Sequence, residues 1–364
     1  MQKKLCFVIR SLSGGGAERV LSNLANYFSL NGYKVILICL DHEEVKYNVE
    51  PNIIVKTLVN RGGKKDKLSR IYYAVVTFAK LMRVISKEQP LCSISFMTSV
   101  NLWTGLCCWL LNKPFIVSER TSPYYTLAKF NGMTKWIAFK IYSKAKNVVL
   151  PSKSMSSSLR SIPQFEHLNN LVSIYNPVNV FNAPLKNAVH HRPFVLSVGR
   201  LDHDKGFDLL IDAFYLLNDP NIDLLISGVG PSKYLLKKKV AKLGLKSKVK
   251  FIGFKRNLQD YYVRAEIFVL ASRVEGYPNV LVEAMSLGCP VVATDCDFGP
   301  AEIIKHGVNG LLVQLEDASG LANAMENLLH NPNLRSKFAA NGKLINQTNS
   351  IENIAQEWEN LILS

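Results

Sequence analysis

The sequence has no repeat of fixed period and no long tract rich in Gly and Ser, in Gln and Asn, or in Pro. This absence argues against a repeat protein and against extended disorder. Its seven cysteines are scattered, mostly inside apolar runs, and no CxxC pair occurs. An odd, scattered set argues against a disulfide framework and against a structural zinc site. We therefore expect reduced core cysteines in a cytoplasmic protein.

Long apolar segments are missing as well. The run that precedes the glycines at residues 14–16 is too short for a signal peptide. The longest apolar stretch, residues 100–111, has about half the length that a bilayer span needs. We expect no segment that crosses a membrane.

Charge is distributed unevenly between the two halves of the chain. Residues 1–180 contain 24 Lys and Arg against 9 Asp and Glu, whereas residues 181–364 contain 20 against 19. A basic surface confined to one half predicts an anionic partner for that half, which can be phosphate, acidic lipid or nucleic acid. The alternative is a basic surface that serves only solubility.

Length and patterning predict two α/β domains. A chain of 364 residues, 48% of them apolar, can build two cores. Short apolar runs alternate with amphipathic stretches, which predicts two Rossmann-like, doubly wound parallel sheets facing each other across a cleft. The predicted strands are residues 5–9, 35–40, 53–59, 92–96, 115–118, 147–150, 194–198, 223–227, 249–251, 267–270, 290–293 and 310–313. The predicted helices include residues 18–30 and residues 67–87, the latter with apolar positions at 68, 71, 72, 75, 79, 82 and 85.

Prolines mark the predicted boundary between the domains. Three of them interrupt the regular pattern within residues 175–193, and a residue that precedes proline favours extended backbone. We place an N-terminal domain at residues 1–180 and a C-terminal domain at residues 181–345. The amphipathic end, residues 346–364, is predicted to be a helix that crosses back to the N-terminal domain.

A Gly-rich loop follows the first predicted strand. Gly15 and Gly16 allow backbone amides to approach a phosphate or a sugar closely, and the following helix directs its positive end to the same place. The loop lacks the Lys-Ser/Thr of a P-loop and the GxGxxG spacing of a dinucleotide site, which argues against an ATPase and a dehydrogenase. The alternative is an ordinary tight turn between a strand and a helix.

Two basic residues follow the first predicted strand of the C-terminal domain, within residues 199–206 (GRLDHDKG). Arg200 and Lys205 are placed to bind a diphosphate and to stabilise the charge on a leaving nucleotide diphosphate. The alternative is a solvated loop. Asp-x-Asp patterns start at residues 202 and 295, and two matches in a chain of ordinary acidity favour chance. We predict no essential metal.

Residues 273–284 (RVEGYPNVLVEA) contain two carboxylates separated by a turn. Glu275 is predicted to lie in a loop and Glu283 within the following helix, so that both can face one ligand. Carboxylates accept hydrogen bonds from the vicinal hydroxyls of sugars and riboses. The amides of residues 276–281 are expected to be exposed at the helix start and able to hold phosphate. The alternative is a pair of unrelated surface acids.

In this order the motifs resemble those of the retaining glycosyltransferases of family 4, which have the two-domain GT-B fold. The resemblance covers essentially the whole chain, through GGGAER, VSER at residues 117–120, YNPV, GRLDHDKG, SGVGP, FIGF, EGYPNVLVEA and GCPVVATD. It implies a nucleotide-sugar donor, held by the C-terminal domain, and a metal-independent transfer that retains anomeric configuration.

The resemblance also implies roles for individual residues. Arg200 and Lys205 would bind the diphosphate, Glu283 the ribose and Glu275 the transferred sugar. Gly15 and Gly16 would close over the donor, and residues 254–256 would border the base. The donor-binding set is Gly15, Gly16, Arg200, Lys205, Gly230, Phe254, Lys255, Glu275, Gly276, Tyr277, Pro278, Asn279, Val280, Leu281 and Glu283. The catalytic set is Arg120, Arg200, Lys205 and Glu275.

The sequence departs from the family pattern at Arg120, where many members carry a histidine. That histidine usually approaches the transferred sugar or the acceptor, whereas arginine cannot act as a general base near neutral pH. Arg120 could hold a phosphate or a sugar hydroxyl instead. Front-face transfer requires no protein base, because the leaving phosphate accepts the proton of the acceptor.

The basic N-terminal domain is the main indication of the acceptor. A basic cluster lies on or beside the apolar-striped helix at residues 67–87: Lys64, Lys65, Lys67, Arg70, Lys80, Arg83 and Lys87. Such a surface can lie on anionic lipid, where each basic residue adds up to about 1 kcal/mol, or bind a polyprenyl-linked diphosphate. The predicted acceptor-binding residues are Glu119, Arg120, Lys67 and Arg70. The alternative is a core-packed helix with a solvated basic side.

Family members with such acceptors build bacterial surface polysaccharides, including O-antigen, or lipid-linked oligosaccharides at the cytoplasmic face of the inner membrane. Residues 275–302 most resemble members that use UDP-N-acetylhexosamines, so a hexose, GalNAc or GlcNAc from UDP is expected. One rival is a UDP-sugar 2-epimerase of the same fold. Another is a non-catalytic nucleic-acid binder, but the aromatics are not interleaved with Lys and Arg as stacking platforms require, and we expect no nucleic-acid partner.

Overall fold

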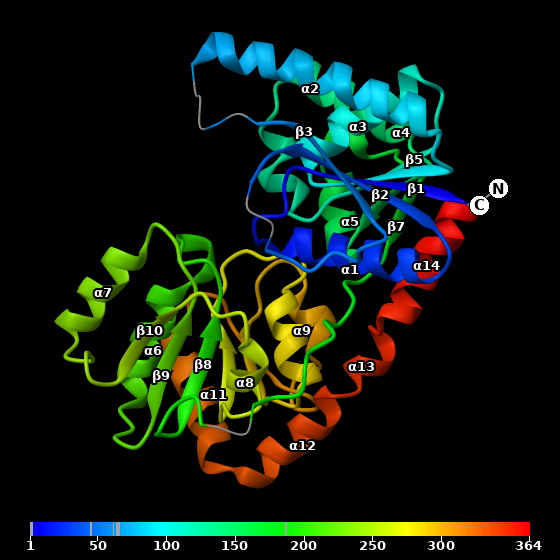
Figure 1. Cartoon of the computed structure of the whole chain (residues 1–364). Helices are drawn as coiled ribbons and strands as arrows, with labels where there is room; N and C mark the ends of the chain where they lie inside the picture. Colours follow the sequence, from blue (N-terminus) through cyan, green and yellow to red (C-terminus); the bar gives the residue numbers. More distant parts are fainter. Residues whose placement is uncertain (1–2, 44–45, 61, 63–65, 186–187) are drawn as a thin grey trace. The chain divides into compact units, whose positions relative to one another are not determined.

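The computed structural model describes residues 3–43, 46–60, 62, 66–185 and 188–364, without the side chain of Lys67. The chain divides into two compact units (Figure 1). Unit 1 comprises residues 1–177 and 351–364, and unit 2 comprises residues 178–350. The division therefore follows Pro177 directly, and residues 346–350 stay with unit 2.

Unit 1 contains a seven-stranded, fully parallel sheet in the order β3-β2-β1-β4-β5-β6-β7. Helices on both faces of such a sheet bury its strands, which explains the continuous apolar runs in the sequence. In β1, for example, every residue from Leu5 to Ile9 is buried. The strands are β1 (Lys4–Ile9), β2 (Lys34–Asp41), β3 (Ile54–Val59), β4 (Cys92–Phe96), β5 (Phe115–Ser118), β6 (Asn147–Leu150) and β7 (Leu171–Ser173).

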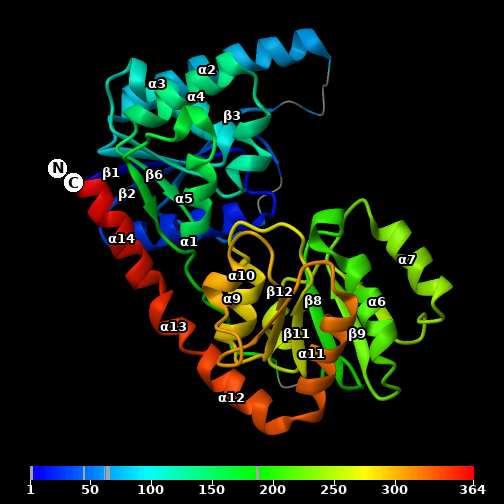
Figure 2. The same cartoon turned by 180° about the vertical axis from the view of Figure 1, so that it is seen from behind.

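The helices of unit 1 cover the two faces of this sheet. In both views α2 (Lys67–Glu88), α3 (Thr98–Leu110) and α4 (Gly132–Lys144) lie on one face, while α1 (Gly16–Leu30) and α14 (Ile351–Leu363) lie on the other (Figures 1 and 2). The short helix α5 (Lys153–Arg160) follows β6. Asp66 begins α2 as a side-chain cap, because its carboxylate accepts a hydrogen bond from the Ser69 amide at 2.9 Å.

The last helix of the chain completes the core of unit 1. Ile354, Ala355, Trp358 and Ile362 of α14 are buried in the same apolar cluster as residues of α1 and β1. The ring of Trp358 stacks on that of Phe96, with 5.7 Å between centroids.

Unit 2 contains a six-stranded parallel sheet in the order β10-β9-β8-β11-β12-β13. Its strands are β8 (Phe194–Val198), β9 (Asp223–Ser227), β10 (Val249–Gly253), β11 (Ile267–Leu270), β12 (Val291–Thr294) and β13 (Leu311–Val313). Figure 2 shows α6 and α11 side by side against the sheet. The helices are α6 (Phe207–Leu217), α7 (Lys233–Lys242), α8 (Leu258–Tyr262), α9 (Asn279–Ser286), α10 (Pro300–Ile303), α11 (Ala318–His330), α12 (Pro332–Gly342) and α13 (Ile345–Thr348).

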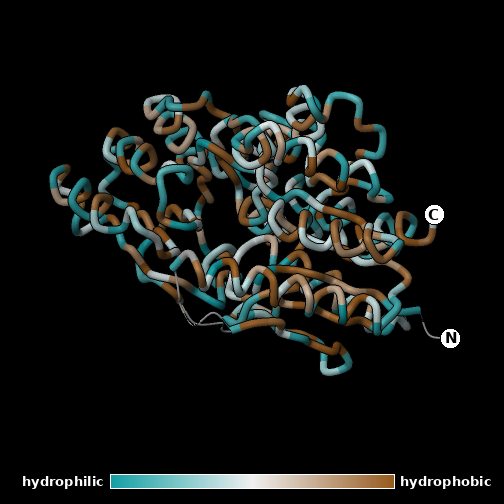
Figure 3. Tube along the Cα trace, turned by 90° about the horizontal axis from the view of Figure 1, so that it is seen from above, coloured by the Kyte–Doolittle hydropathy of each residue, from teal (hydrophilic) through white to brown (hydrophobic). Residues whose placement is uncertain are grey.

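The prediction of two doubly wound α/β domains is confirmed, and each predicted strand is present with its ends shifted by at most two residues. The edge strand β7 was not predicted, because it is short and only half-buried and so lacks an apolar run. All seven cysteines are buried and form no disulfide. Hydrophobic and hydrophilic residues alternate over short stretches of the chain (Figure 3), and no helix within the described ranges is long and apolar enough to cross a bilayer.

Candidate active site

The candidate site of unit 2 lies where its strand order reverses. The chain proceeds outward from β8 through β9 to β10, then returns to pair β11 with the other side of β8. In open parallel sheets, ligands bind at the carboxyl ends of the strands beside this reversal. The loops that follow β8 and β11 contain the two most informative sequence motifs. The topology therefore brings residues 199–206 and residues 271–278 together.

An ion pair joins these two loops. The Nζ atom of Lys205 lies 2.7 Å from Oε1 of Glu275, although the residues are 70 positions apart in sequence. The hydroxyl of Ser272 donates to the same Oε1 at 2.6 Å. The Lys205 side chain is 26% exposed and that of Glu275 8%, so both are held in place while the ammonium group remains reachable by an anionic ligand.

Glycine is required where these loops pack against each other. Gly206 has a φ of +59°, and a Cβ atom there would lie 1.9 Å from the carbonyl oxygen of Ala271. At Gly228, after β9, a Cβ atom would lie 1.8 Å from the carbonyl oxygen of Gly199. Atoms that are not bonded to each other cannot lie so close, so both glycines permit the close approach of backbones at this end of the sheet.

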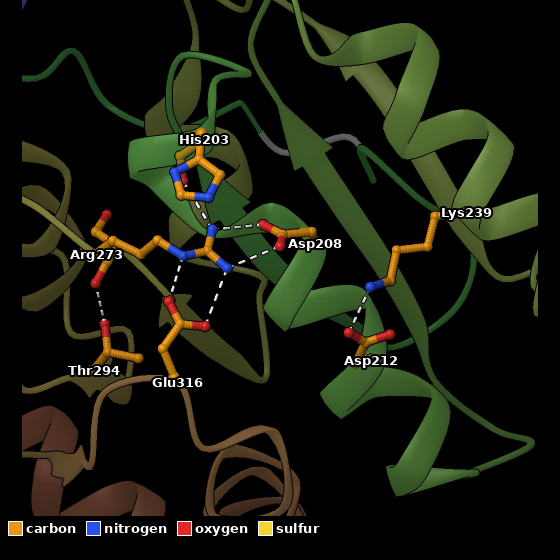
Figure 4. Close-up of polar contacts among 8 residues, drawn as sticks. His203, Asp208, Asp212, Lys239, Arg273, Thr294 and Glu316 are labelled. Atoms are coloured by element: carbon orange, nitrogen blue, oxygen red, sulfur yellow. Dashed lines mark hydrogen bonds and ion pairs between the residues drawn. The ribbon is translucent and has the colours of Figure 1, made fainter.

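Arg273 fixes the turn that carries Lys205, a role that was not predicted from the sequence. Its guanidinium donates from Nη1 and Nη2 to the two carboxylate oxygens of Asp208 at 2.7 and 2.8 Å, and from Nη1 to the carbonyl of His203 at 2.8 Å (Figure 4). It also pairs with Glu316. These two carboxylates hold the pKa of Arg273 above its ordinary value. A basic residue two positions before Glu275 was visible in the sequence, but its distant partners were not.

Arg200 differs from Lys205 in its surroundings. Its side chain is 72% exposed, and its Nε atom donates to Asp202. An exposed guanidinium on a loop can move to meet a second phosphate group, whereas the Lys205 ammonium is already positioned. Within the described ranges, no group of three or more His, Cys, Asp and Glu side chains is arranged to hold a metal ion.

Glu283 lies in the second turn of α9, and Glu275 lies in the loop before that helix, as predicted. Glu283 is only 1% exposed. Its Oε1 accepts a hydrogen bond from Asn179 Nδ2 at 2.6 Å, and its Oε2 accepts one from the Tyr262 hydroxyl at 3.1 Å. A ribose hydroxyl can therefore reach this carboxylate only when a covering side chain moves.

Most of residues 276–281 are more buried than the sequence suggested, and phosphate binding by the amides at the start of α9 stays a prediction. Gly276, Tyr277, Pro278 and Leu281 are buried, and only Asn279 and Val280 are partly exposed. The packing of the preceding turn explains the difference. A Cβ atom at Gly299 would lie only 2.6 Å from Cδ of Pro278, and the Tyr277 hydroxyl accepts a hydrogen bond from the side chain of Asn349 at 2.8 Å.

Residues 254–256, expected to border the base, lie in the loop that follows β10, and the donor-binding candidate Gly230 lies in the loop that follows β9. Phe254 is 48% exposed, and the ammonium group of Lys255 lies 5.9 Å from the centroid of the Tyr261 ring. Gly230 packs on the loop that carries Arg200, where an added Cβ atom would lie 2.4 Å from the carbonyl oxygen of Leu201. These loops are neighbours because β9 and β10 pair in parallel.

In unit 1, the Gly-rich loop lies at the carboxyl end of β1 and starts α1. Gly15 is the N-cap of this helix, and its carbonyl accepts a hydrogen bond from the Tyr47 hydroxyl at 2.8 Å. The carboxylate of Glu18 folds back over Gly15, where an added Cβ atom would lie 2.0 Å from Glu18 Oε2. Burial raises the pKa of Glu18. A phosphate that approached Gly15 and Gly16 would therefore compete with this side chain.

Glu119 was predicted to bind the acceptor, and the structure places it inside unit 1 with no exposed surface. It accepts hydrogen bonds from Thr98 Oγ1 at 2.6 Å, from Asn101 Nδ2 at 3.2 Å and from the Tyr142 hydroxyl. Burial raises the pKa of the Glu119 carboxyl. The Glu119 side chain therefore links the end of β5 to α3 and α4. Arg120, the next residue of the predicted acceptor-binding set, remains partly exposed.

Of the basic cluster, Lys64 and Lys65 lie outside the described residues. Lys67 begins α2, but its side chain is also outside the description, whereas Arg70 is exposed. The apolar positions of this helix do not form one buried stripe. Leu68, Ile71, Tyr72 and Val75 are 81, 64, 63 and 64% exposed. The buried positions in α2 are Thr77, Leu81 and Ile85.

Both halves of the chain match glycosyltransferase family models. The model of glycosyltransferase family 4 matches residues 14–180, and that of the group 1 glycosyl transferases matches residues 183–345. The chain belongs to these glycosyltransferases. It is 29% identical, over 99% of this chain and 100% of the relative, to an uncharacterised glycosyltransferase of Haemophilus influenzae.

A second relative has a more specific name. The chain is 26% identical, over 99% of its length and 98% of the relative, to the GalNAc-alpha-(1->4)-GalNAc-alpha-(1->3)-diNAcBac-PP-undecaprenol alpha-1,4-N-acetyl-D-galactosaminyltransferase of Campylobacter jejuni. Among solved structures, Anabaena HepE in complex with UDP and glucose aligns over 99% of each chain, with a TM-score of 0.80 at 19% identity. The fold of this glycosyltransferase is therefore GT-B.

Proposed function

We propose that this glycosyltransferase is a retaining, metal-independent enzyme that moves a hexose or N-acetylhexosamine, GalNAc or GlcNAc, from UDP to a polyprenyl-diphosphate-linked or polysaccharide acceptor. The observation that carries the proposal is the Lys205–Glu275 pair at the point where the strand order of unit 2 reverses. It sets a cation for the diphosphate beside a carboxylate that can accept hydrogen bonds from sugar hydroxyls.

The chemistry follows from these charges. An acceptor hydroxyl forms a bond to the anomeric carbon while the bond from that carbon to the diphosphate oxygen breaks, and UDP leaves. Negative charge grows on the leaving diphosphate, where Lys205 and the exposed Arg200 can stabilise it. The departing phosphate takes the acceptor proton from the same face, so no protein base is needed and the anomeric configuration is retained.

The relatives support the choice of substrates. HepE binds UDP, and the name of the Campylobacter jejuni relative specifies N-acetylgalactosamine transfer to an undecaprenol-linked diphosphate glycan. By the same reasoning we place the chain in the synthesis of bacterial surface polysaccharide or lipid-linked glycan, at the cytoplasmic face of the inner membrane.

To test the function, the purified chain is incubated with a panel of UDP-sugars and a polyprenyl-diphosphate-linked glycan, with and without EDTA. We expect an α-linked product from a UDP-N-acetylhexosamine and the same rate in EDTA. Reactions without acceptor are the control for the rival 2-epimerase. Full epimer conversion without transfer would replace our proposal with that rival, and loss of activity in EDTA would remove the metal-independent part of it.

We further propose that unit 1 binds an anionic membrane surface through exposed apolar stripes on α2 and α4. The stripe on α2 consists of Leu68, Ile71, Tyr72 and Val75, at the i, i+3, i+4, i+7 spacing of one helix face. It is unfavourable to expose such an apolar face to water, and apolar residues flanked by basic ones suit the interface of an anionic bilayer. Arg83 supplies exposed positive charge on the same helix.

Helix α4 carries a matching stripe. Met133, Trp136 and Ile137 are 75, 57 and 39% exposed, again at i, i+3 and i+4. Lys140 follows one turn later, and its ammonium group lies 5.6 Å from the Trp136 ring centroid. Tryptophan and lysine together favour the headgroup region of a bilayer. Both helices lie on the same face of the unit 1 sheet (Figures 1 and 2).

For the membrane surface, we expect Ile71→Ser together with Val75→Ser to weaken binding to phosphatidylglycerol-containing vesicles by roughly tenfold or more. The reason is that two aliphatic side chains would no longer insert into the bilayer. Co-sedimentation measures the binding. Leu235→Ser is the matched control, because Leu235 of unit 2 is 65% exposed on α7. Equal binding by the double variant and the control would contradict the proposed surface.

A further inference from the structure

Arg120 occupies a prepared position at the carboxyl end of β5. Its guanidinium carbon lies 3.8 Å from the centroid of the Phe96 ring and 5.8 Å from that of Trp358. Phe96 ends β4, the neighbour of β5, and Trp358 belongs to the core of unit 1. The rings of Phe96 and Trp358 therefore hold the guanidinium group in place. What this group binds then depends on the N–H groups along its edges.

One edge of this group is satisfied and the other is not. Nη1 donates to Oδ1 of Asn176 at 2.6 Å. Nε and Nη2 are buried, and among the described residues neither has a hydrogen-bond partner. These two nitrogens form the side of the fork that grips two oxygens of one carboxylate or phosphate.

The neighbouring acid forms no ion pair with Arg120, although the charge of Glu119 opposes the effect of burial on the pKa of Arg120. Glu119 turns its carboxylate toward Thr98, Asn101 and Tyr142, and none of the described acidic residues forms an ion pair with Arg120. Two buried guanidinium nitrogens with unmade hydrogen bonds are costly, and burial lowers the pKa of Arg120 to about 9. Without a ligand these hydrogen bonds stay unmade. An oxyanion with two parallel acceptor oxygens would accept both of them and remove the unfavourable free energy.

We infer that the Nε–Nη2 edge of Arg120 is a binding site for a substrate diphosphate, at the position where many family members carry a histidine. The inference deepens the proposed function and rests on it for the choice of anion. In that reaction a diphosphate occurs in the nucleotide-sugar donor and in the polyprenyl-linked acceptor. Both present the same pair of oxygens to a fork, so binding experiments must separate the two sources.

The test compares the wild-type chain with Arg120→Lys and Asn176→Asp. Lysine keeps the charge but loses the fork. Aspartate at 176 keeps Arg120 and places a carboxylate against Nη1, so the cation gains a partner inside the protein. We expect both variants to fold, and Asn176→Asp to melt at a higher temperature than the wild type when no ligand is present. Lys144→Gln, which removes an exposed charge on α4, is the control.

Isothermal titration measures the affinity for UDP and, separately, for farnesyl diphosphate as a probe of the acceptor. We expect at least one affinity to fall about tenfold or more in both variants and to stay within about twofold in the control. Loss of UDP binding alone assigns the site to the donor, and loss of farnesyl diphosphate binding alone assigns it to the acceptor. Unchanged affinities for both ligands would overturn the inference. The titrations need no turnover, so an active enzyme with unchanged affinities would leave the proposed function standing.

Discussion

Lys205→Ala is expected to lower kcat/KM for sugar transfer by about 10²- to 10³-fold, the typical cost of removing one electrostatic stabiliser of a transition state. The ammonium group lies 2.7 Å from Glu275 and is the fixed positive charge of the candidate site. Its removal also leaves the Glu275 carboxylate beside the diphosphate without a counter-charge. Steady-state kinetics with the donor found in the substrate panel measures the loss, and thermal melting shows that the fold persists.

Two comparisons make this result specific to the site. Lys237→Ala removes an exposed lysine from α7 and should leave kcat/KM within about twofold of the wild type, as is usual for surface changes. Glu275→Ala and Arg200→Ala should both abolish most of the turnover. Near wild-type turnover in Lys205→Ala, Glu275→Ala and Arg200→Ala would mean that the donor site lies elsewhere.

Gly206→Ala is expected to reduce the free energy of unfolding by about 3 kcal/mol or more. The added Cβ atom would lie 1.9 Å from the Ala271 carbonyl oxygen. That atom belongs to backbone, so the two loops must separate, and the separation also pulls Lys205 away from Glu275. Urea unfolding followed by circular dichroism measures the change, and UDP binding should weaken in parallel.

Gly244→Ala distinguishes this clash from simple backbone strain. Gly244 has a φ of +73°, close to the +59° of Gly206, but no atom lies within 4 Å of the position that its Cβ would occupy. The substitution therefore carries only the strain of a left-handed alanine, about 1 kcal/mol. Equal losses of stability in the two variants would contradict the role that we assign to the contact with Ala271.

The strands and the motif loops could be predicted from the sequence because their signals are local. A parallel strand buried on both faces, such as β1, is a short apolar run, and that run is visible without any partner. The positions of Glu275 in a loop and of Glu283 in a helix followed from a Gly-Tyr-Pro-Asn turn. The order of the motifs then indicated the family, which agrees with the two doubly wound domains that the patterning predicts.

The rest depends on contacts between distant residues. Arg273 acts through Asp208 and Glu316, which no spacing rule connects to it. Periodicity indicated an apolar stripe on α2, but this helix is apolar on two sides, and only packing decides that Ile85 is buried while Ile71 is exposed. The prediction that Glu119 binds the acceptor failed in the same way, because its hydrogen-bond partners come from α3 and α4.

Helix α14 imposes an order on folding during synthesis. Unit 2 is inserted between residues 177 and 351 of unit 1, and Trp358 fills the core that begins with β1. While the ribosome makes unit 2, the nascent unit 1 therefore presents an open apolar groove along α1 and Phe96. Unit 2 can close before unit 1 does, although unit 1 is made first. Amino-terminal domains usually finish folding first, whereas here the core of unit 1 can be completed only after α14 has been made.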